Sequence, residues 1–137
     1  MQPFEIIDHT ADVAIVAHGA TRQELFANAA RAMFAIIAEP RSVAPRQTRQ
    51  LHIEAADPQA LLADFLAELL YLFDGELFVL HHAELTALTD RAVDAVLHGE
   101  PVAPHHVFNT EIKAVTHHNL SVEQTEDGWR ATVLFDI

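Results

Sequence analysis

Apolar and polar residues alternate in several short segments, which predicts β-strands at both ends of the chain. Residues 4–7 and 13–18 are short and rich in β-branched side chains, as strands usually are. Residues 8–12, with the sequence Asp-His-Thr-Ala-Asp, connect these two segments. Residues 111–116 and 129–135 have the same strand-like character, so we expect two further strands near the other end.

A different spacing of apolar residues predicts two helices. Thr21 and Glu24 form a capping box that starts the first helix, and Pro40 marks its end. Asp57 and Pro58 provide an N-cap and a first helical residue for the second helix. The apolar stripe of the second helix is wide, so we expect that helix to lie across the centre of a sheet. The stripe of the first helix consists of Phe26, Ala29, Ala30, Met33 and Ile37.

The middle of the chain predicts more β structure. Residues 51–55 alternate in polarity, and residues 77–88 and 92–97 predict a hairpin. Two helices among many strands, without strict β-α-β alternation, indicate the α+β class. We therefore predict a single compact α+β domain over residues 1–137, with a mixed or antiparallel sheet packed by two helices.

Composition limits the kinds of protein this chain can be. Its 137 residues suit one domain, and a hydrophobic content of 50% argues against disorder. The chain has no Cys, which excludes disulfide scaffolds, thiolate zinc sites and Cys nucleophiles. It has neither an apolar run of the roughly 20 residues needed to span a membrane nor a signal-peptide pattern. From these absences we expect a cytoplasmic protein.

The charge balance bears on the choice of partner. The formal net charge is −12, which repels a phosphate backbone, so we do not expect strong direct nucleic acid binding. Arg41, Arg46 and Arg49 flank a Pro-containing loop and form a candidate basic patch, although they also fit a role in solubility alone. A protein partner with a basic surface fits the overall charge better.

Carboxylates near the two ends of the chain suggest a metal site. Asp12 stands at the start of one predicted strand and Asp136 at the end of another, beside Ile137 with its terminal carboxylate. If these meet on one sheet edge, their hard oxygen atoms suit Mg²⁺, Ca²⁺ or Mn²⁺. Taken singly, each Asp also has a structural interpretation. Asp12 can be a turn residue whose side chain caps backbone N–H groups, and Asp136 can be a solvated residue at the chain end.

Five segments, in order along the chain, resemble the archease family. Residues 8–13 resemble its opening motif, and residues 19–30 resemble the Ala-rich helix that follows. Residues 61–73 resemble its second helix, and residues 112–118 resemble its K-A-x-T-Y-H segment. Residues 135–137 resemble its D-I ending. Because the five matches are spread over nearly the whole chain, in order and at family-like spacing, the resemblance is more specific than any single motif.

The resemblance implies a function through a partner. Archeases are protein cofactors of the GTP-dependent RNA ligase of the RtcB type, which acts in tRNA splicing and RNA repair. They promote guanylylation of the ligase and its multiple turnover. For this chain the resemblance implies metal ligation by Asp12, Asp136 and Ile137, and an inserted β subdomain, which we place within about residues 40–108.

Other residues beside the motif have both functional and structural interpretations. His9 is suited to act as a metal ligand, a proton carrier or a partner contact, and equally as a buried His that shapes the loop. We interpret Asp8 as a structural residue. Lys113 and His118 are candidates for contacts to a partner or around the site, although Lys113 also fits a solvent-facing strand residue. His117 stands where the family usually has Tyr, so no role of that hydroxyl transfers to this chain.

The His doublets raise the question of a zinc site. The doublets are His81-His82, His105-His106 and His117-His118. Because neighbouring strand residues point to opposite faces, we expect a doublet to supply only one ligand to a site. Without Cys or an H-E-x-x-H helix, zinc is the weaker interpretation, and we expect most of these His residues to be surface positions.

Three functions compete at this point. The first is a non-enzymatic, metal-binding cofactor of an RNA ligase. The second is a small metal-dependent phosphoester hydrolase, with Asp12 and Asp136 holding the metal and His9 as general base. The third is a general chaperone or adaptor for RNA-modifying proteins. The sequence leaves the metal, the oligomeric state and the ligase-binding face open.

Overall fold

The computed structural model describes residues 2–8 and 11–137. Over these residues the chain forms two antiparallel sheets and two α-helices. The helices are α1 (Arg22–Ile37) and α2 (Pro58–Glu76), with a short 3-10 turn η1 (Pro40–Ser42) after α1. The strands are β1 (Phe4–Asp8), β2 (Asp12–Gly19), β3 (Gln47–Glu54), β4 (Phe78–Leu88), β5 (Ala92–Pro101), β6 (Ala114–Thr125) and β7 (Gly128–Asp136).

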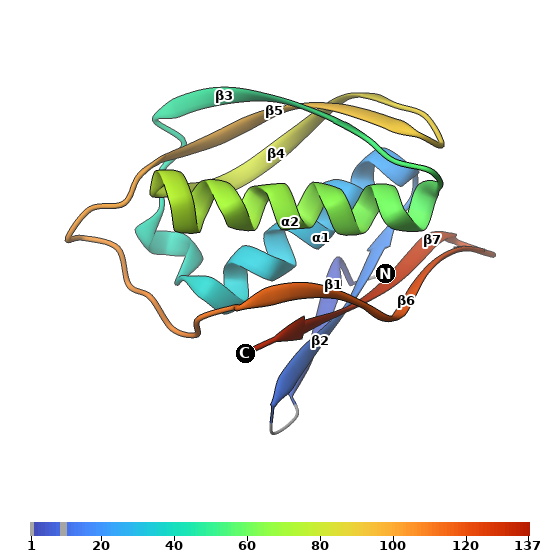
Figure 1. The fold of residues 1–137 in the computed structure, drawn as a ribbon, viewed down its shortest axis with the longest axis horizontal. Helices are drawn as coiled ribbons and strands as arrows, with labels where there is room; N and C mark the ends of the chain where they lie inside the picture. Colours follow the sequence, from blue (N-terminus) through green and yellow to red (C-terminus); the bar gives the residue numbers. More distant parts are fainter. Residues whose placement is uncertain (1, 9–10) are drawn as a thin grey trace.

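The helices lie between the two sheets, as Figure 1 shows. One sheet has the strand order β1-β2-β7-β6, and the other has the order β3-β5-β4. Helix α1 packs against β2 and β4, and α2 packs against β6 and β4. The α+β class is confirmed, and the strands form two separate antiparallel sheets, the second of them from residues within the predicted 40–108 range. Because both helices are covered from two sides, they need apolar stripes as wide as those in the sequence.

Local capping signals position both helices as the sequence predicts. The Thr21 hydroxyl accepts a hydrogen bond from the Glu24 N–H at 3.1 Å. The Asp57 carboxylate accepts one from the Ala60 N–H at 2.8 Å, with Pro58 in the first turn. Leu77, which we expected to begin a strand, instead ends α2 in the left-handed conformation at φ 55°.

The β2–β7 ladder divides the first sheet into a core face and an outer face. Val13 pairs with Phe135, and Ile15 pairs with Val133; all four side chains belong to the hydrophobic core. Successive side chains on a strand alternate between faces. Asp12 and Asp136, which are next to Val13 and Phe135 at the end of the ladder, therefore belong to the outer face.

A long connection leads from β5 to β6 across the end of α1. Glu39 donates its N–H to the Val107 carbonyl at 2.8 Å, and Asn109 donates to the Ile37 carbonyl at 2.9 Å. Strand β6 then begins at Ala114, three residues later than expected, because residues up to 113 belong to this connection. The predicted subdomain range of 40–108 contains η1, β3, α2, β4 and β5, and its separate character stays a prediction. In the described part of the chain, neither α1 nor α2 combines the length and apolar character of a membrane span.

Candidate functional site

Asp12 and Asp136 stand directly opposite each other across the β2–β7 ladder. They form the last pair of that ladder, beyond the core pair Val13 and Phe135. Directly opposed residues of an antiparallel pair have Cβ atoms about 4.5–5.5 Å apart and share one face. Two carboxylates that lie far apart in the sequence thus meet at one end of the sheet. We call Asp12, Asp136 and the main chain of Ile137 the acidic edge.

One oxygen of the Asp12 carboxylate, Oδ1, is buried without a hydrogen bond from the described residues. A buried polar atom without a partner costs about 1–3 kcal/mol, and a charged one costs more. A divalent cation bound by this oxygen would remove that penalty, and carboxylate oxygens are ligands that Ca²⁺ and Mg²⁺ prefer. The residues of the acidic edge therefore fit a hard cation.

The backbone around the acidic edge is tied down on both sides of Asp136. Lys113 donates its N–H to the Asp136 carbonyl at 2.8 Å, and Ile137 donates its N–H to the Ala11 carbonyl at 3.3 Å. The side chain of Lys113 is exposed. These bonds hold the main chain of Ile137 beside the segment that leads into Asp12.

The other predicted site residues have different surroundings. His118 is exposed in the irregular part of β6 between Thr116 and Ser121, where the pairing register with β7 shifts. Its backbone N–H donates to the Thr116 hydroxyl at 3.3 Å. His9 and the side chain of Asp8 lie outside the residues that the structure describes.

A second cluster of ionisable groups, which the sequence analysis did not single out, surrounds Glu100 at the end of β5. The Glu100 side chain is only 3% exposed. Its Oε1 atom lies 2.5 Å from His105 Nε2 and 2.6 Å from His106 Nε2. Burial raises the pKa of the Glu100 carboxyl, but the hydrogen bonds from the two His rings outweigh burial and lower it below its ordinary value. The carboxyl is thus held in its ionised form.

The Glu100 cluster could by proximity hold a metal ion, because one ligand atom of each residue lies within 4.8 Å of the others. The hydrogen bonds of His106 favour a different interpretation. Its Nδ1 atom accepts the Ala103 N–H at 2.9 Å, so the proton of the neutral ring is on Nε2. An Nε2–H group donates to Glu100 and has no lone pair for a metal. The buried imidazole therefore acts as a donor to Glu100 Oε1, whereas Glu100 Oε2 is buried without a hydrogen-bond partner among the described residues and lies 3.3 Å from Arg46 Nε.

The prediction that a His doublet supplies only one group to a site is wrong for His105-His106. That argument assumed a strand, whereas these residues lie in the turn and connection after β5. In a turn, neighbouring side chains can converge, and these two rings lie 4.1 Å apart between centroids. The break in the strand pattern at Pro101 and Pro104 was the available signal.

The candidate basic patch is largely used in ion pairs. Arg46 Nε lies 3.3 Å from Glu100 Oε2, and Arg49 pairs with Glu76 at 2.7 Å. The Arg49 guanidinium also lies over the Phe78 ring, 4.7 Å from its centroid. Of the three arginines, only Arg41 makes no ion pair within the described residues. This arrangement gives no concentrated basic surface here.

Fold and site together define a class: a small α+β domain in which two antiparallel sheets enclose two helices and one sheet ends in paired carboxylates. Comparison with protein families shows that the archease protein family matches residues 4–137. The chain belongs to the archease family.

Individual relatives agree with this assignment. The chain is 40% identical to the archease of Methanosarcina acetivorans over 139 residues, which cover 98% of this chain and 95% of that protein. It is 37% identical to the archease of Methanopyrus kandleri, covering 98% and 99% of the two chains. The solution structure of protein 1598 of Methanobacterium thermoautotrophicum matches with a TM-score of 0.85 and 30% identity, covering 100% of both chains.

A more distant structure supports the fold alone. The crystal structure of a Thermotoga maritima archease, described as a possible chaperone, has a TM-score of 0.68 and 20% identity. The match covers 96% of this chain and 94% of that one. The two-sheet arrangement is therefore also found at low sequence identity.

Proposed function

We propose that this protein is a metal-binding cofactor that activates a GTP-dependent RNA ligase of the RtcB type, in tRNA splicing and RNA repair. It promotes guanylylation of the ligase and its multiple turnover, and it is an accessory protein with no catalytic step of its own. Membership of the archease family supports the proposal at the level of the family. The observation that carries it for this chain is the pairing of Asp12 with Asp136, together with a buried Asp12 oxygen that has no hydrogen-bond partner in residues 2–8 and 11–137.

In this proposal the acidic edge holds one divalent cation, with Ca²⁺, Mg²⁺ and Mn²⁺ as the candidates. Asp12, Asp136 and a main-chain oxygen of Ile137 are its protein ligands, and water completes the shell. The cation supplies a positive charge that is open to a partner. The residues themselves position it: the β2–β7 ladder holds the two carboxylates opposite each other, and the Lys113 N–H holds the Asp136 backbone.

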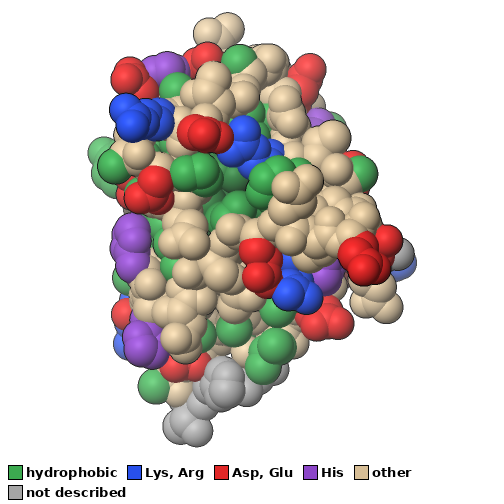
Figure 2. All heavy atoms as spheres, turned by 90° about the vertical axis from the view of Figure 1, so that its right-hand side faces the viewer, with side chains coloured by type: hydrophobic (Ala, Val, Ile, Leu, Met, Phe, Trp, Pro, Cys, Tyr) green, Lys and Arg blue, Asp and Glu red, His purple; other side chains and the backbone are tan. Residues whose placement is uncertain are grey.

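The charge of the molecule supports a protein partner. On the face shown in Figure 2, acidic side chains are spread among basic and apolar ones, without a continuous basic surface. The net charge of −12 disfavours direct contact with an RNA backbone. A ligase that itself binds RNA needs a basic surface, to which this protein is complementary.

The test is guanylylation and multiple-turnover joining by the cognate ligase, with and without this protein. We expect a large gain in turnover that Asp12→Asn and Asp136→Asn both remove. Asp64→Asn, at an exposed position of α2, is the matched control and should retain full stimulation. No gain with an active ligase would contradict the proposal. Hydrolysis of a phosphoester by this protein alone would instead favour the metal-dependent hydrolase.

A further inference from the structure

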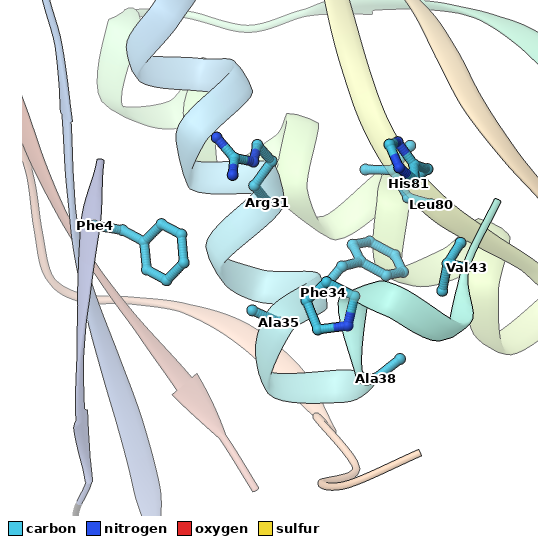
Figure 3. A pocket seen from close by; sticks show the side chains of 9 residues that line it. Phe4, Arg31, Phe34, Ala35, Ala38, Val43, Leu80 and His81 are labelled. Atoms are coloured by element: carbon cyan, nitrogen blue, oxygen red, sulfur yellow. The ribbon is translucent and has the colours of Figure 1, made fainter. Parts of the chain in front are cut away.

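A small cavity opens between the two sheets, beside the C-terminal half of α1. Its volume is about 150 Å³, and Figure 3 shows it from close by. Its apolar wall comes from α1, the segment after it, and β4: Phe34, Ala35, Ala38, Val43 and Leu80. A cavity of about this size can hold a benzene ring. It therefore has room for one apolar side chain.

The rim of the cavity carries two basic side chains. Arg31 extends from α1 on the side of Phe4, and His81 stands across the cavity on β4, as Figure 3 shows. Arg31 makes no ion pair with any described residue. It lies near enough to His82 to help lower the pKa of that ring, after burial and the neighbouring His98 and His81. Arg41 and Arg91 also make no ion pair within the described residues, but of these three arginines only Arg31 lines this cavity.

The ion-paired arginines have their charge neutralised within the fold. Each ion-paired arginine in the described residues has an acidic partner on another element or on a neighbouring strand. These pairs are Arg22 with Asp90, Arg46 with Glu100, Arg49 with Glu76 and Arg130 with Glu123. Arg31 instead borders an apolar cavity, where an incoming carboxylate would provide the missing charge.

Strand β1 extends the apolar surface away from the cavity. Phe4 lines the cavity. Ile6, two residues further along β1, lies on the same face of the strand and is 41% exposed. Among the described strands, β1 pairs with β2 alone and forms an edge of its sheet. Because β1 runs from the cavity toward the connection that precedes Asp12, one partner could contact both the cavity and the acidic edge.

We propose that this cavity receives an apolar side chain of a protein partner, and that Arg31 and His81 hold an acidic residue next to it. A protein segment is favoured over a nucleotide because the cavity wall is apolar and offers few groups to read a base. The inference rests on the proposed function in one respect, since it takes the partner to be the RNA ligase. The recognised chemistry is an apolar residue beside a carboxylate.

The direct test is an NMR titration of the whole protein with two dipeptide probes. N-acetyl-Phe-Asp-amide should give saturable shifts at Ala35, Ala38, Val43 and Leu80. N-acetyl-Phe-Asn-amide, which lacks the charge, should bind about twofold to fivefold more weakly. Arg31→Gln should remove that difference, whereas Ala35→Leu should fill the cavity and abolish the shifts from both probes.

The outcomes separate this inference from the proposed function. Absence of saturable shifts, or shifts produced by GMP and not by the dipeptides, would overturn the docking site. In the ligase assay, Arg31→Gln should raise the concentration of this protein needed for half-maximal stimulation without changing the maximum. An unchanged half-maximal concentration would overturn the ligase as the occupant. If the wild-type protein does not stimulate the ligase, the proposed function fails and the dipeptide titration alone decides the cavity.

Discussion

Asp12 and Asp136 are direct cross-strand partners, so two like charges face each other at the end of the β2–β7 ladder. Like charges directly opposite each other destabilise an antiparallel pair. The hydrogen bonds of Lys113 and Ile137 nevertheless keep the backbone in this register. A cation bound by both carboxylates would offset their mutual repulsion.

The first prediction concerns stability without metal. In excess EDTA, Asp12→Asn should raise the free energy of unfolding by about 0.2–1 kcal/mol, because it removes the repulsion with Asp136. With Ca²⁺ at a hundredfold above its Kd, the wild type should gain about 2.7 kcal/mol and the variant much less. Urea unfolding in EDTA and in Ca²⁺ should show that Asp12→Asn is the more stable protein without metal and that the wild type is the more stable with it. Asp64→Asn should change neither value, and equal stability of wild type and Asp12→Asn in Ca²⁺ would argue against a metal at this edge.

The second prediction concerns acid sensitivity at Glu100. The pKa of this carboxyl is lower in the folded protein than its ordinary value of 4.5. The ionised carboxyl therefore contributes to the free energy of unfolding, and this contribution is present above pH 4.5. It is lost as the pH falls through the folded-state pKa. Glu100→Gln should lower the free energy of unfolding at neutral pH by about 1–3 kcal/mol, since His105 and His106 lose a charged acceptor.

The pH dependence of unfolding should also change with Glu100→Gln. Below pH 4.5 the wild type should lose stability more steeply than the variant. Urea unfolding between neutral pH and acid measures both slopes. Glu126→Gln, at an exposed turn position, is the control and should follow the wild type. Parallel curves for wild type and Glu100→Gln would contradict the lowered pKa of the Glu100 carboxyl.

The third prediction concerns the proton of His106. The Ala103 N–H bonded to Nδ1 requires a neutral ring with its proton on Nε2. Nitrogen-15 NMR of the ring should report that tautomer at neutral pH. Added Zn²⁺ should leave the His106 signals in place, because Nε2 is a donor to Glu100. A zinc-induced switch of the proton to Nδ1 would show instead that the Glu100 cluster is a metal site.

The fourth prediction concerns His52 on the outer side of β3. Hydrogen bonds with Glu54, at 2.9 Å, and Asp94, at 2.6 Å, raise the pKa of His52 above 6.5. Folding therefore favours the protonated form of His52. The stabilisation that results is fully present below pH 6.5 and is lost as the pH rises through the folded-state pKa. Titration of the ring by proton NMR should show the raised value.

The two partners of His52 should contribute unequally. The hydrogen bond with Glu54 is the larger cause of the shift, so Glu54→Gln should lower the pKa of His52 more than Asp94→Asn does. The two variants serve as controls for each other, since both remove one carboxylate from the same exposed site. The reverse order would assign the main effect to Asp94.

The sequence predicted features that depend on neighbouring residues, such as the two helix caps, better than it predicted contacts between distant segments. The caps at Thr21 and Asp57 were predictable because each hydrogen bond joins residues three positions apart. The candidate pair Asp12 and Asp136 was found as strand-end residues and from family resemblance. Their direct opposition depends on the register of β2 against β7, which packing of Val13 and Phe135 in the core selects.

The sequence by itself determined the α+β class, both helix starts and the family. Alternation and capping are local properties, so they can be read without knowing the fold. Only the tertiary structure decided that there are two sheets, that His105 and His106 converge on Glu100, and that Arg31 borders a cavity with Phe4 and His81. These contacts join segments through turns and layers, and their geometry follows from the packing of the helices between the sheets.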